Sequence, residues 1–324
     1  MHCQFRLRIF AVLELLPMRF LKYILYLSPI LAFVVAISIR QANEGALGSY
    51  SNPIRFYFTP SVNAKTISTN ARVLTDYLHK ETGLYFTTAV PASYIAVVEA
   101  FGTDKVDVAA INTFSYLMAH AKYGAEARLR VVRQGQTSYC GEIIARVGTG
   151  INSLKDLNGK SFAFVDPSST SGYILPKALF DSLGIRLGHT VFAMEHPNVV
   201  TMVYQRRVDA GACYYAPPDP KTGAIMDARA RVLAQFPDVA KKVKIIGFTQ
   251  YIPNDPIVFR RNLSRKLKRI ITDALLKFVK TPAGKKAWED IYDVTGLVRT
   301  NDSDYDGIRV LLEEQHVDFE KLVK

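Results

Sequence analysis

Residues 162–183, FAFVDPSSTSGYILPKALFDSL, predict a buried strand, a turn and the start of a helix. The strand is the uninterrupted apolar run from Phe162 to Val165, which is typical of a strand covered on both faces, and it ends at Asp166. Small hydroxyl residues occupy Ser168 to Ser171, and apolar residues at helical spacing follow them.

The turn has the chemistry of an oxyanion site. A helix start leaves amide hydrogens without intrahelical partners and carries about half a unit of positive charge. The hydroxyls of Ser169, Thr170 and Ser171 add donors at the same place, so a phosphate-like group could bind there without Lys or Arg. The alternative is ordinary helix capping, for which Ser and Thr are common residues. Pro176 favours a ligand site, because a proline this close to the helix start predicts a loose first turn with free amides.

The body of the chain alternates strands and helices. With 324 residues, 49% of them hydrophobic, it is long enough for two compact lobes. The alternation predicts α/β architecture with mostly parallel sheets, in which ligands bind at the carboxyl ends of the strands. Strands are expected at 54–58, 85–90, 106–111, 129–133, 142–147, 162–165, 190–193, 208–214 and 244–248, and helices at 94–101, 113–123, 198–207, 264–279, 281–292 and 303–315.

Two crossings between the lobes are expected, one at Gly148 to Gly150 and one within Tyr251 to Val258. They would form a hinge and a cleft. Each lobe contains the pattern V-D-x-x-A after a helix, and we expect its acidic residue, Asp107 or Asp209, to be structural. The expected division is a leader at 1–42, a linker at 43–52, a first lobe at 53–146 plus 249–324, and a second lobe at 147–248.

The leader contains seventeen consecutive residues without a charge, Tyr23 to Ile39, preceded by Arg19 and Lys22 and followed by Arg40. This pattern predicts either an export signal or an uncleaved anchor in the inner membrane, with the body in the periplasm. Both alternatives stay open, because a small-x-small cleavage site is not evident.

The net charge of +12 raises the question of nucleic-acid binding, but the first 40 residues carry +4 of it. The densest basic cluster, Arg260 to Arg269, lacks any accompanying nucleic-acid motif. We therefore expect no nucleic-acid partner, and interpret the cluster as a solvated helix face or as a face for a protein or a negative membrane surface. Cys140 and Cys213 lie in apolar strands and are expected to be buried free thiols; no metal or cofactor is expected.

Four motifs together resemble a known family. They are D-P-x-S-T-S-G at 166–172, a His after a strand at His196, V-D-A-G-A at 208–212 and I-P-N-D-P at 252–256. This combination resembles the periplasmic phosphonate-binding proteins, the solute receptors of phosphate, phosphite and phosphonate ABC importers. The resemblance implies a type II periplasmic-binding-protein fold, with two doubly wound lobes around a hinge and cleft. It also implies a monomeric receptor whose partners are a small phosphorus oxyanion and an ABC permease.

The resemblance also implies which residues bind the ligand. The family motifs place the phosphoryl oxygens on the S-T-S run and add two tyrosines, a histidine and an aspartate. The implied site residues are Tyr94, Tyr139, Ser169, Thr170, Ser171, His196 and Asp255. The next acidic residue after V-D-A-G-A is Asp219, which favours phosphite, phosphate or methylphosphonate over an aminoalkyl phosphonate. Through Asp255, we expect the site to favour ligands that carry a P–OH group.

Two rival functions stay open at this stage. Ser171, His196 and Asp255 could be a nucleophile, a base and an orienting group of a hydrolase, although the serine lacks the G-x-S-x-G elbow. No catalytic activity is expected on that ground. If the leader stays attached, the protein could instead be a tethered oxyanion sensor, although the chain contains no recognisable signalling region.

Overall fold

The computed structural model describes residues 45–314, which belong to two compact units divided at Pro53 and Ile54. Residues 45–53 form turns, with the Gly48 amide donating to the Asn52 carbonyl oxygen at 2.7 Å. Within 45–314, we find no helix with the length and apolar character needed to cross a membrane. The expected signal or anchor at Tyr23 to Ile39 lies outside the described residues.

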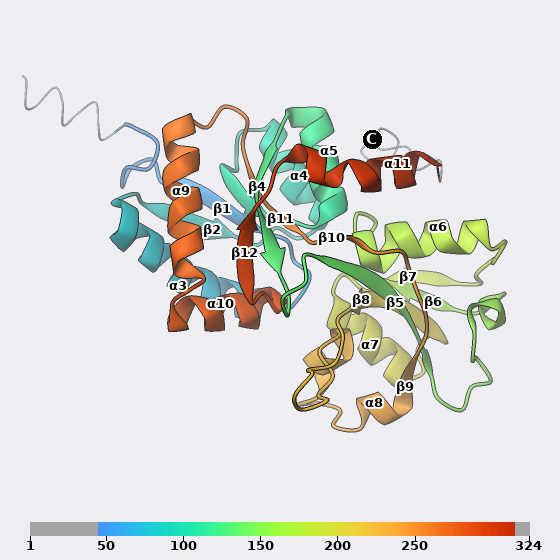
Figure 1. Cartoon of the computed structure of the whole chain (residues 1–324). Coiled ribbons are helices and arrows are strands. Elements are labelled where there is room, and N and C mark those ends of the chain that lie inside the picture. Colours follow the sequence, from blue (N-terminus) through green and yellow to red (C-terminus); the bar gives the residue numbers. More distant parts are fainter. Residues whose placement is uncertain (1–44, 315–324) are drawn as a thin grey trace, which may run out of the picture. The chain divides into compact units, whose positions relative to one another are not determined.

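The larger unit contains two mixed sheets (Figure 1). The first sheet has the strand order β12-β4-β11-β3-β1-β2. Its strands are β1 (Ile54–Phe58), β2 (Phe86–Ala89), β3 (Val108–Ala110), β4 (Glu126–Val132), β11 (Pro256–Phe259) and β12 (Gly296–Arg299). Its helices are α3 (Ala64–Thr82), α4 (Tyr94–Gly102), α5 (Thr113–Tyr123), α9 (Arg265–Phe278), α10 (Pro282–Tyr292), η4 (Asp302–Tyr305) and α11 (Asp306–Glu314).

The second sheet has the order β10-β5-β8-β6-β7, and β9 also pairs with β5. Its strands are β5 (Ser138–Arg146), β6 (Phe162–Phe164), β7 (Thr190–Phe192), β8 (Ala210–Tyr215), β9 (Val243–Phe248) and β10 (Ile252–Pro253). Its helices are η1 (Leu154–Leu157), η2 (Thr170–Ile174), α6 (Leu175–Ser182), α7 (His196–Tyr204), η3 (Ala228–Val232) and α8 (Val239–Lys242). Figure 1 shows α6 on one face of this sheet and α7 on the other.

Strand periodicity explains how both faces of the second sheet are covered. Phe162 on β6 packs with Phe180 of α6, at a ring-centroid distance of 5.3 Å, while the next residue, Ala163, belongs to the apolar cluster of α7. Successive side chains point to opposite faces, so one short apolar strand serves both layers. The apolar run at 162–165 is therefore buried in the way the sequence predicts.

Two features of the expected architecture need correction. The sheets are mixed, because β11 and β5 run antiparallel to their neighbours, whereas the sequence predicted mostly parallel sheets. The first crossing lies between β4 and β5, so β5 belongs to the second lobe and not to the first as the 53–146 boundary implied. Gly148 and Gly150 form a turn after β5, both with positive φ, and this glycine pair was misread as the crossing. The first lobe, built on the first sheet, comprises residues 54–132 and 256–314, and the second lobe, built on the second sheet, comprises residues 138–253.

The acidic residue of the repeated V-D-x-x-A pattern accepts a backbone hydrogen bond in each lobe. Asp107 accepts the backbone N–H of Arg55 at 2.9 Å, and Asp209 accepts the backbone N–H of Ser161 at 2.9 Å. In each case a carboxylate at a helix-to-strand turn fixes the start of a strand. The prediction that Asp107 and Asp209 are structural is confirmed.

Candidate functional site

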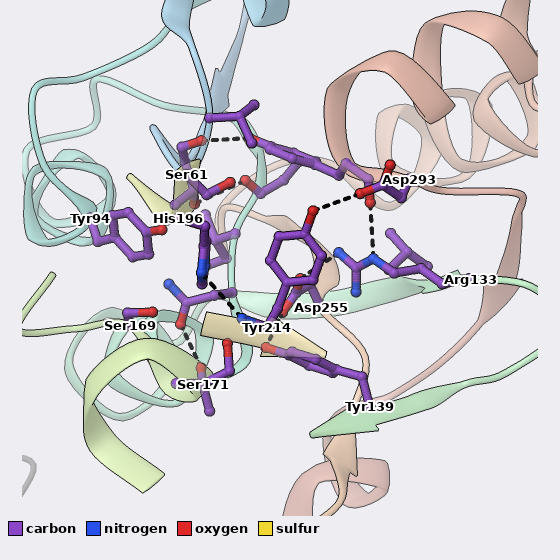
Figure 2. A pocket seen from close by; sticks show the side chains of 18 of the residues that line it. Ser61, Tyr94, Arg133, Tyr139, Ser169, Ser171, His196, Tyr214, Asp255 and Asp293 are labelled. Carbon is purple, nitrogen blue, oxygen red and sulfur yellow. Dashed lines mark hydrogen bonds and ion pairs between the residues drawn. The ribbon is translucent and has the colours of Figure 1, made fainter. Parts of the chain in front are cut away.

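A cavity of about 50 Å³ lies between the two lobes and collects all seven residues that the sequence implied (Figure 2). A cavity needs roughly 10–15 Å³ for each water-sized group, so this one has room for a ligand of a few heavy atoms. Its polar lining comprises Thr59, Ser61, Tyr94, Asn112, Arg133, Tyr139, Ser169, Thr170, Ser171, His196, Tyr214, Arg231, Asp255, Tyr292 and Asp293.

The hydroxyl-rich turn enters helix α6 through a π-helical turn, η2, and Pro176 is the second residue of α6. The first turn is therefore loose, as Pro176 predicted, but its amides are not all free, because those of Tyr173 and Ile174 donate to the Ser169 carbonyl oxygen. Ser169 caps this turn: its Oγ accepts the Gly172 amide at 3.1 Å. A Cβ at Gly172 would lie 2.4 Å from Cγ2 of Val165, so a glycine is needed for the turn to pack on the preceding strand. Capping uses the oxygen of Ser169 and leaves its hydroxyl hydrogen for another acceptor.

Thr170 differs from its two serine neighbours. Its hydroxyl donates to Oδ1 of Asn112 at 2.9 Å and accepts the amide of Phe114 at 2.9 Å. Asn112 and Phe114 lie at the start of α5 in the first lobe. The hydroxyl hydrogen of Thr170 is thus committed to a contact between the lobes, whereas the family resemblance implied a bond to the ligand.

Tyr94 opens helix α4, and its backbone N–H donates to Oδ2 of Asp166 across the lobes at 3.4 Å. Its phenol oxygen is buried and has no hydrogen-bond partner among the residues that the structure describes. Burial, and then the charge of Asp166, raise the pKa of Tyr94 well above its usual value. The side chain is therefore a neutral donor on the cavity wall, without an acceptor among the described residues.

His196 opens helix α7 and connects the lobes through its backbone N–H, which donates to the Ser61 carbonyl oxygen at 3.2 Å. Its ring Nδ1 accepts the backbone N–H of Tyr214 at 3.2 Å, so the neutral ring carries its hydrogen on Nε2. Burial, with the charges of Arg133 and Arg231, lowers the pKa of His196 to about 3. The ring is a neutral hydrogen-bond donor at physiological pH.

Asp255 is paired with Arg133, a residue that the sequence reasoning missed. Nη2 of Arg133 donates to Oδ2 of Asp255 at 2.8 Å, and the hydroxyl of Tyr139 donates to Oδ1 at 3.3 Å. Burial lowers the pKa of Arg133, but the charge and hydrogen bond of Asp255, together with Tyr139 and Asp293, outweigh burial, and the pKa is raised. Burial and the same carboxylate raise the pKa of Tyr139. A signal for Arg133 did exist, because it follows a strand at its carboxyl end, where ligands of α/β proteins bind.

A second ion pair joins the lobes at the cavity wall. Nη2 of Arg231, from η3, lies 2.7 Å from Oδ2 of Asp293, and Nη1 donates to the carbonyl oxygen of Asp290 at 2.9 Å. The cation therefore sits at the carboxyl end of α10, where the helix dipole favours positive charge. Tyr214 adds its hydroxyl to the same carboxylate at 3.0 Å. Nothing in the sequence connects these distant segments.

The charged side chains of the cavity lining are paired with one another, and several other lining side chains can donate hydrogen bonds. Each arginine is paired with one aspartate, and His196 is neutral. Tyr94, Ser169, Ser171 and His196, each of which carries a hydroxyl or a ring N–H, line the same small space. Such a lining suits a small anion with several acceptor oxygens.

Comparison with known proteins agrees with this geometry. The family model described as the periplasmic substrate-binding protein of phosphonate ABC transporters matches residues 56–305. The chain belongs to this family. The type II periplasmic-binding-protein fold and the family implied by the sequence motifs are thereby confirmed. Members of the family are periplasmic substrate-binding proteins of transport systems.

Individual members of the phosphonate-binding family are distant from this chain. The phosphonates-binding periplasmic protein of Escherichia coli K12 is 27% identical over 230 residues, 65% of this chain and 62% of that protein. The phosphate-import protein PhnD of Mycolicibacterium smegmatis is 28% identical over 275 residues, 77% of this chain and 82% of that protein. The match thus spans less than two thirds of the E. coli relative.

Solved structures show the same fold. The binding component of a phosphonate ABC transporter from Pseudomonas aeruginosa has a TM-score of 0.72 at 22% identity, covering 82% of this chain and 87% of that one. PhnD1 of Prochlorococcus marinus, solved with methylphosphonate, has a TM-score of 0.69 at 16% identity, covering 82% of this chain and 98% of that one.

Proposed function

We propose that this chain is an extracytoplasmic solute receptor that captures a small phosphorus oxyanion, namely phosphite, phosphate or a phosphonate, and delivers it to an ABC permease. The observation that carries the proposal is the set of donors around the cavity. The buried hydroxyl of Tyr94 has no partner among the described residues and faces a cavity that Ser171 and His196 also line. Hydrogen bonds to a charged acceptor contribute about 1.5–3 kcal/mol each, so a bound oxyanion would stabilise these groups strongly.

Cavity size and charge support a ligand without an ammonium group. The carboxylates on the cavity wall, Asp255 and Asp293, are each paired with an arginine. Asp219 is tied to its own loop, where it accepts the amide of Lys221 at 2.9 Å. No carboxylate of the cavity lining is therefore unpaired to receive the amine of an aminoalkyl phosphonate. Phosphite, phosphate and methylphosphonate are the substrates we favour.

Capture would work by closure of the lobes on the ligand. Contacts between the lobes surround the cavity: Thr170 with Asn112, His196 with Ser61, and Arg231 with Asp293. A ligand held by Tyr94 of the first lobe and Ser171 of the second would add to these contacts and favour the closed state. The closed form would then dock on the membrane permease as a monomer.

A hydrolase is disfavoured by the hydrogen bonds at the site. Asp255 is bonded to Arg133 and Tyr139, while Nδ1 of His196 accepts a backbone amide. The three groups of the rival mechanism therefore do not form a chain from nucleophile to base to orienting carboxylate. With a pKa of about 3, His196 would also be a poor base at neutral pH. We infer that the protein binds its ligand without turning it over.

We further propose that the protein acts in the periplasm after export directed by Tyr23 to Ile39, either cleaved or retained as an inner-membrane anchor. A tethered sensor would have the same cavity. Detecting the released or the membrane-bound form in cell fractions separates the two fates of the leader. A partner permease, recovered by crosslinking in the presence of ligand, would favour transport over sensing.

The binding experiment is a calorimetric titration of the full chain, purified in mild detergent, with phosphite, phosphate, methylphosphonate and 2-aminoethylphosphonate. We expect saturable binding of at least one of the first three and weaker binding of the aminated ligand. A phosphomonoester incubated with the same protein should stay intact. Absence of detectable binding to all four ligands, or hydrolysis of the phosphomonoester, would contradict the proposal.

A further inference from the structure

We propose that Arg133 makes this site select the fully ionised, doubly charged form of its oxyanion. The inference rests on the proposed function and specifies the ligand's charge state. It starts from the difference between the structure and the expectation for Asp255. An unpaired aspartate beside the ligand would favour a P–OH group, because a carboxylate accepts a hydrogen bond and repels a second negative charge. Asp255, however, is paired with Arg133.

Both oxygens of Asp255 already accept hydrogen bonds from protein donors. Oδ2 accepts from Arg133 at 2.8 Å and Oδ1 accepts from Tyr139 at 3.3 Å. The positive charge of Arg133 offsets the carboxylate at close range, so a second negative charge on the ligand is no longer opposed. The ligand therefore does not need to carry a proton in order to bind beside Asp255.

Arg133 also offers the ligand a donor of its own. Nη1 is buried and has no hydrogen-bond partner among the described residues, while Nη2 is bonded to Asp255. The guanidinium is held in place by Nε, which donates to the Tyr292 carbonyl oxygen at 2.9 Å, and by the Tyr139 ring, whose centroid is 5.4 Å from Cζ. Figure 2 shows Arg133 on the cavity wall between Asp255 and Asp293. A fixed guanidinium whose Nη1 amino group is unpartnered among the described residues is suited to an ionised phosphoryl oxygen.

The histidine and the four tyrosines that line the cavity with Arg133 stay uncharged near neutral pH. His196 has a pKa of about 3, and burial raises the pKa of Tyr94, Tyr139, Tyr214 and Tyr292. Asp255 and Asp293 are in ion pairs with Arg133 and Arg231. Between pH 6 and pH 9, the pH dependence of ligand affinity therefore reports the proton of the ligand.

The test is the affinity of the full chain for phosphate and for methylphosphonate from pH 6 to pH 9, by calorimetry. Both ligands lose their second proton near neutral pH. If the doubly charged form binds, the association constant rises up to about tenfold per pH unit below the ligand's second pKa and levels above it. If the singly charged form binds, the constant is level at low pH and falls above that pKa.

Variants at Arg133 test whether it is the cause. Arg133→Gln should lower affinity about 100-fold at pH 9 and less than about tenfold at pH 6, which removes the rise with pH. Arg133→Lys keeps the charge and should keep the rise at lower affinity. Arg133→Gln combined with Asp255→Asn removes both charges and should regain about tenfold at pH 9 over Arg133→Gln alone. Arg128→Gln, at an exposed arginine of the strand that precedes Arg133, is the matched control and should behave as wild type.

The outcomes separate this inference from the function on which it rests. An affinity that rises with pH in the wild type and not in Arg133→Gln supports it. An affinity that falls with pH, or a rise that Arg133→Gln retains, overturns it while oxyanion binding stands. Absence of binding to every ligand at every pH overturns the proposed function together with it. Thermal unfolding of each variant identifies any that fail to fold, and the lysine and double variants then decide the matter.

Discussion

The hydroxyl of Thr170 donates a hydrogen bond to Oδ1 of Asn112, 2.9 Å away, and thereby joins the second lobe to the first. Ser169 and Ser171, on either side of Thr170, line the same cavity. Three adjacent hydroxyl residues thus differ in their contacts: Ser169 caps a turn, Thr170 connects the lobes, and Ser171 lines the cavity.

Replacing Thr170 by valine should weaken ligand binding indirectly. The change keeps the shape of the side chain and removes the bond to Asn112, at a cost of about 1–3 kcal/mol to the closed state. Because ligand binds the closed state, affinity should fall about tenfold or more. Thr170→Ser keeps the hydroxyl and is the control. Calorimetry measures the affinity, and small-angle scattering of the ligand-free protein should show a more open average form. Wild-type affinity in Thr170→Val would exclude this role.

Tyr94→Phe should lower ligand affinity without lowering the stability of the ligand-free protein. The substitution removes a buried hydroxyl that has no partner among the described residues, so the ligand-free protein should be as stable as wild type or slightly more stable. Ligand affinity should fall about 10–100-fold, since a charged acceptor loses a donor. Urea unfolding and titration are measured on the same samples. A loss of stability with unchanged affinity would mean that Tyr94 is a packing residue only.

The buried ring of His196 predicts a loss of stability in acid. Its folded pKa is about 3, below the usual value of about 6.5, so on acidification the unfolded chain takes up the proton first. Stability conferred above pH 6.5 should therefore decline toward pH 3, by up to about 1.4 kcal/mol per pH unit. His196→Asn should reduce this slope in urea unfolding of the ligand-free protein. His189→Asn, at an exposed position, is the control, and equal slopes in both variants would contradict the assignment.

Glu142 should have the opposite pH dependence. It is fully buried on β5, and neither carboxyl oxygen has a hydrogen-bond partner among the described residues. Burial, and then the charge of Asp227, raise its pKa well above the usual value, so the group contributes stability at low pH that is lost as pH rises. Glu142→Gln should therefore stabilise the protein at pH 8 relative to wild type, by more than at pH 4. Equal effects of the substitution at pH 4 and pH 8 would show that Glu142 is ionised in the folded state.

Local patterns predicted most of the elements. The helix of residues 113–123 and the strand of 54–58 have the bounds expected, because Asn112 and Gly124 cap the helix and prolines flank the strand. The placement of β5 failed for a physical reason: a buried apolar strand pairs equally well in either sheet, and the glycine turn after it resembled a crossing. The turn at Ser169 was identifiable because its donors are adjacent in the sequence. Arg133 with Asp255, and Arg231 with Asp293, come from segments that only the tertiary fold brings together.

The most direct measurement is a titration of Ser171→Ala beside Ser168→Ala with the oxyanion that binds the wild type best. The two serines share one buried turn, but Ser171 lines the cavity and Ser168 is outside its lining. We expect Ser171→Ala to lose about tenfold or more in affinity and Ser168→Ala to keep the affinity of the wild type. Equal affinities of the two variants, or absence of binding by the wild type, would contradict the claim that this cavity holds the oxyanion.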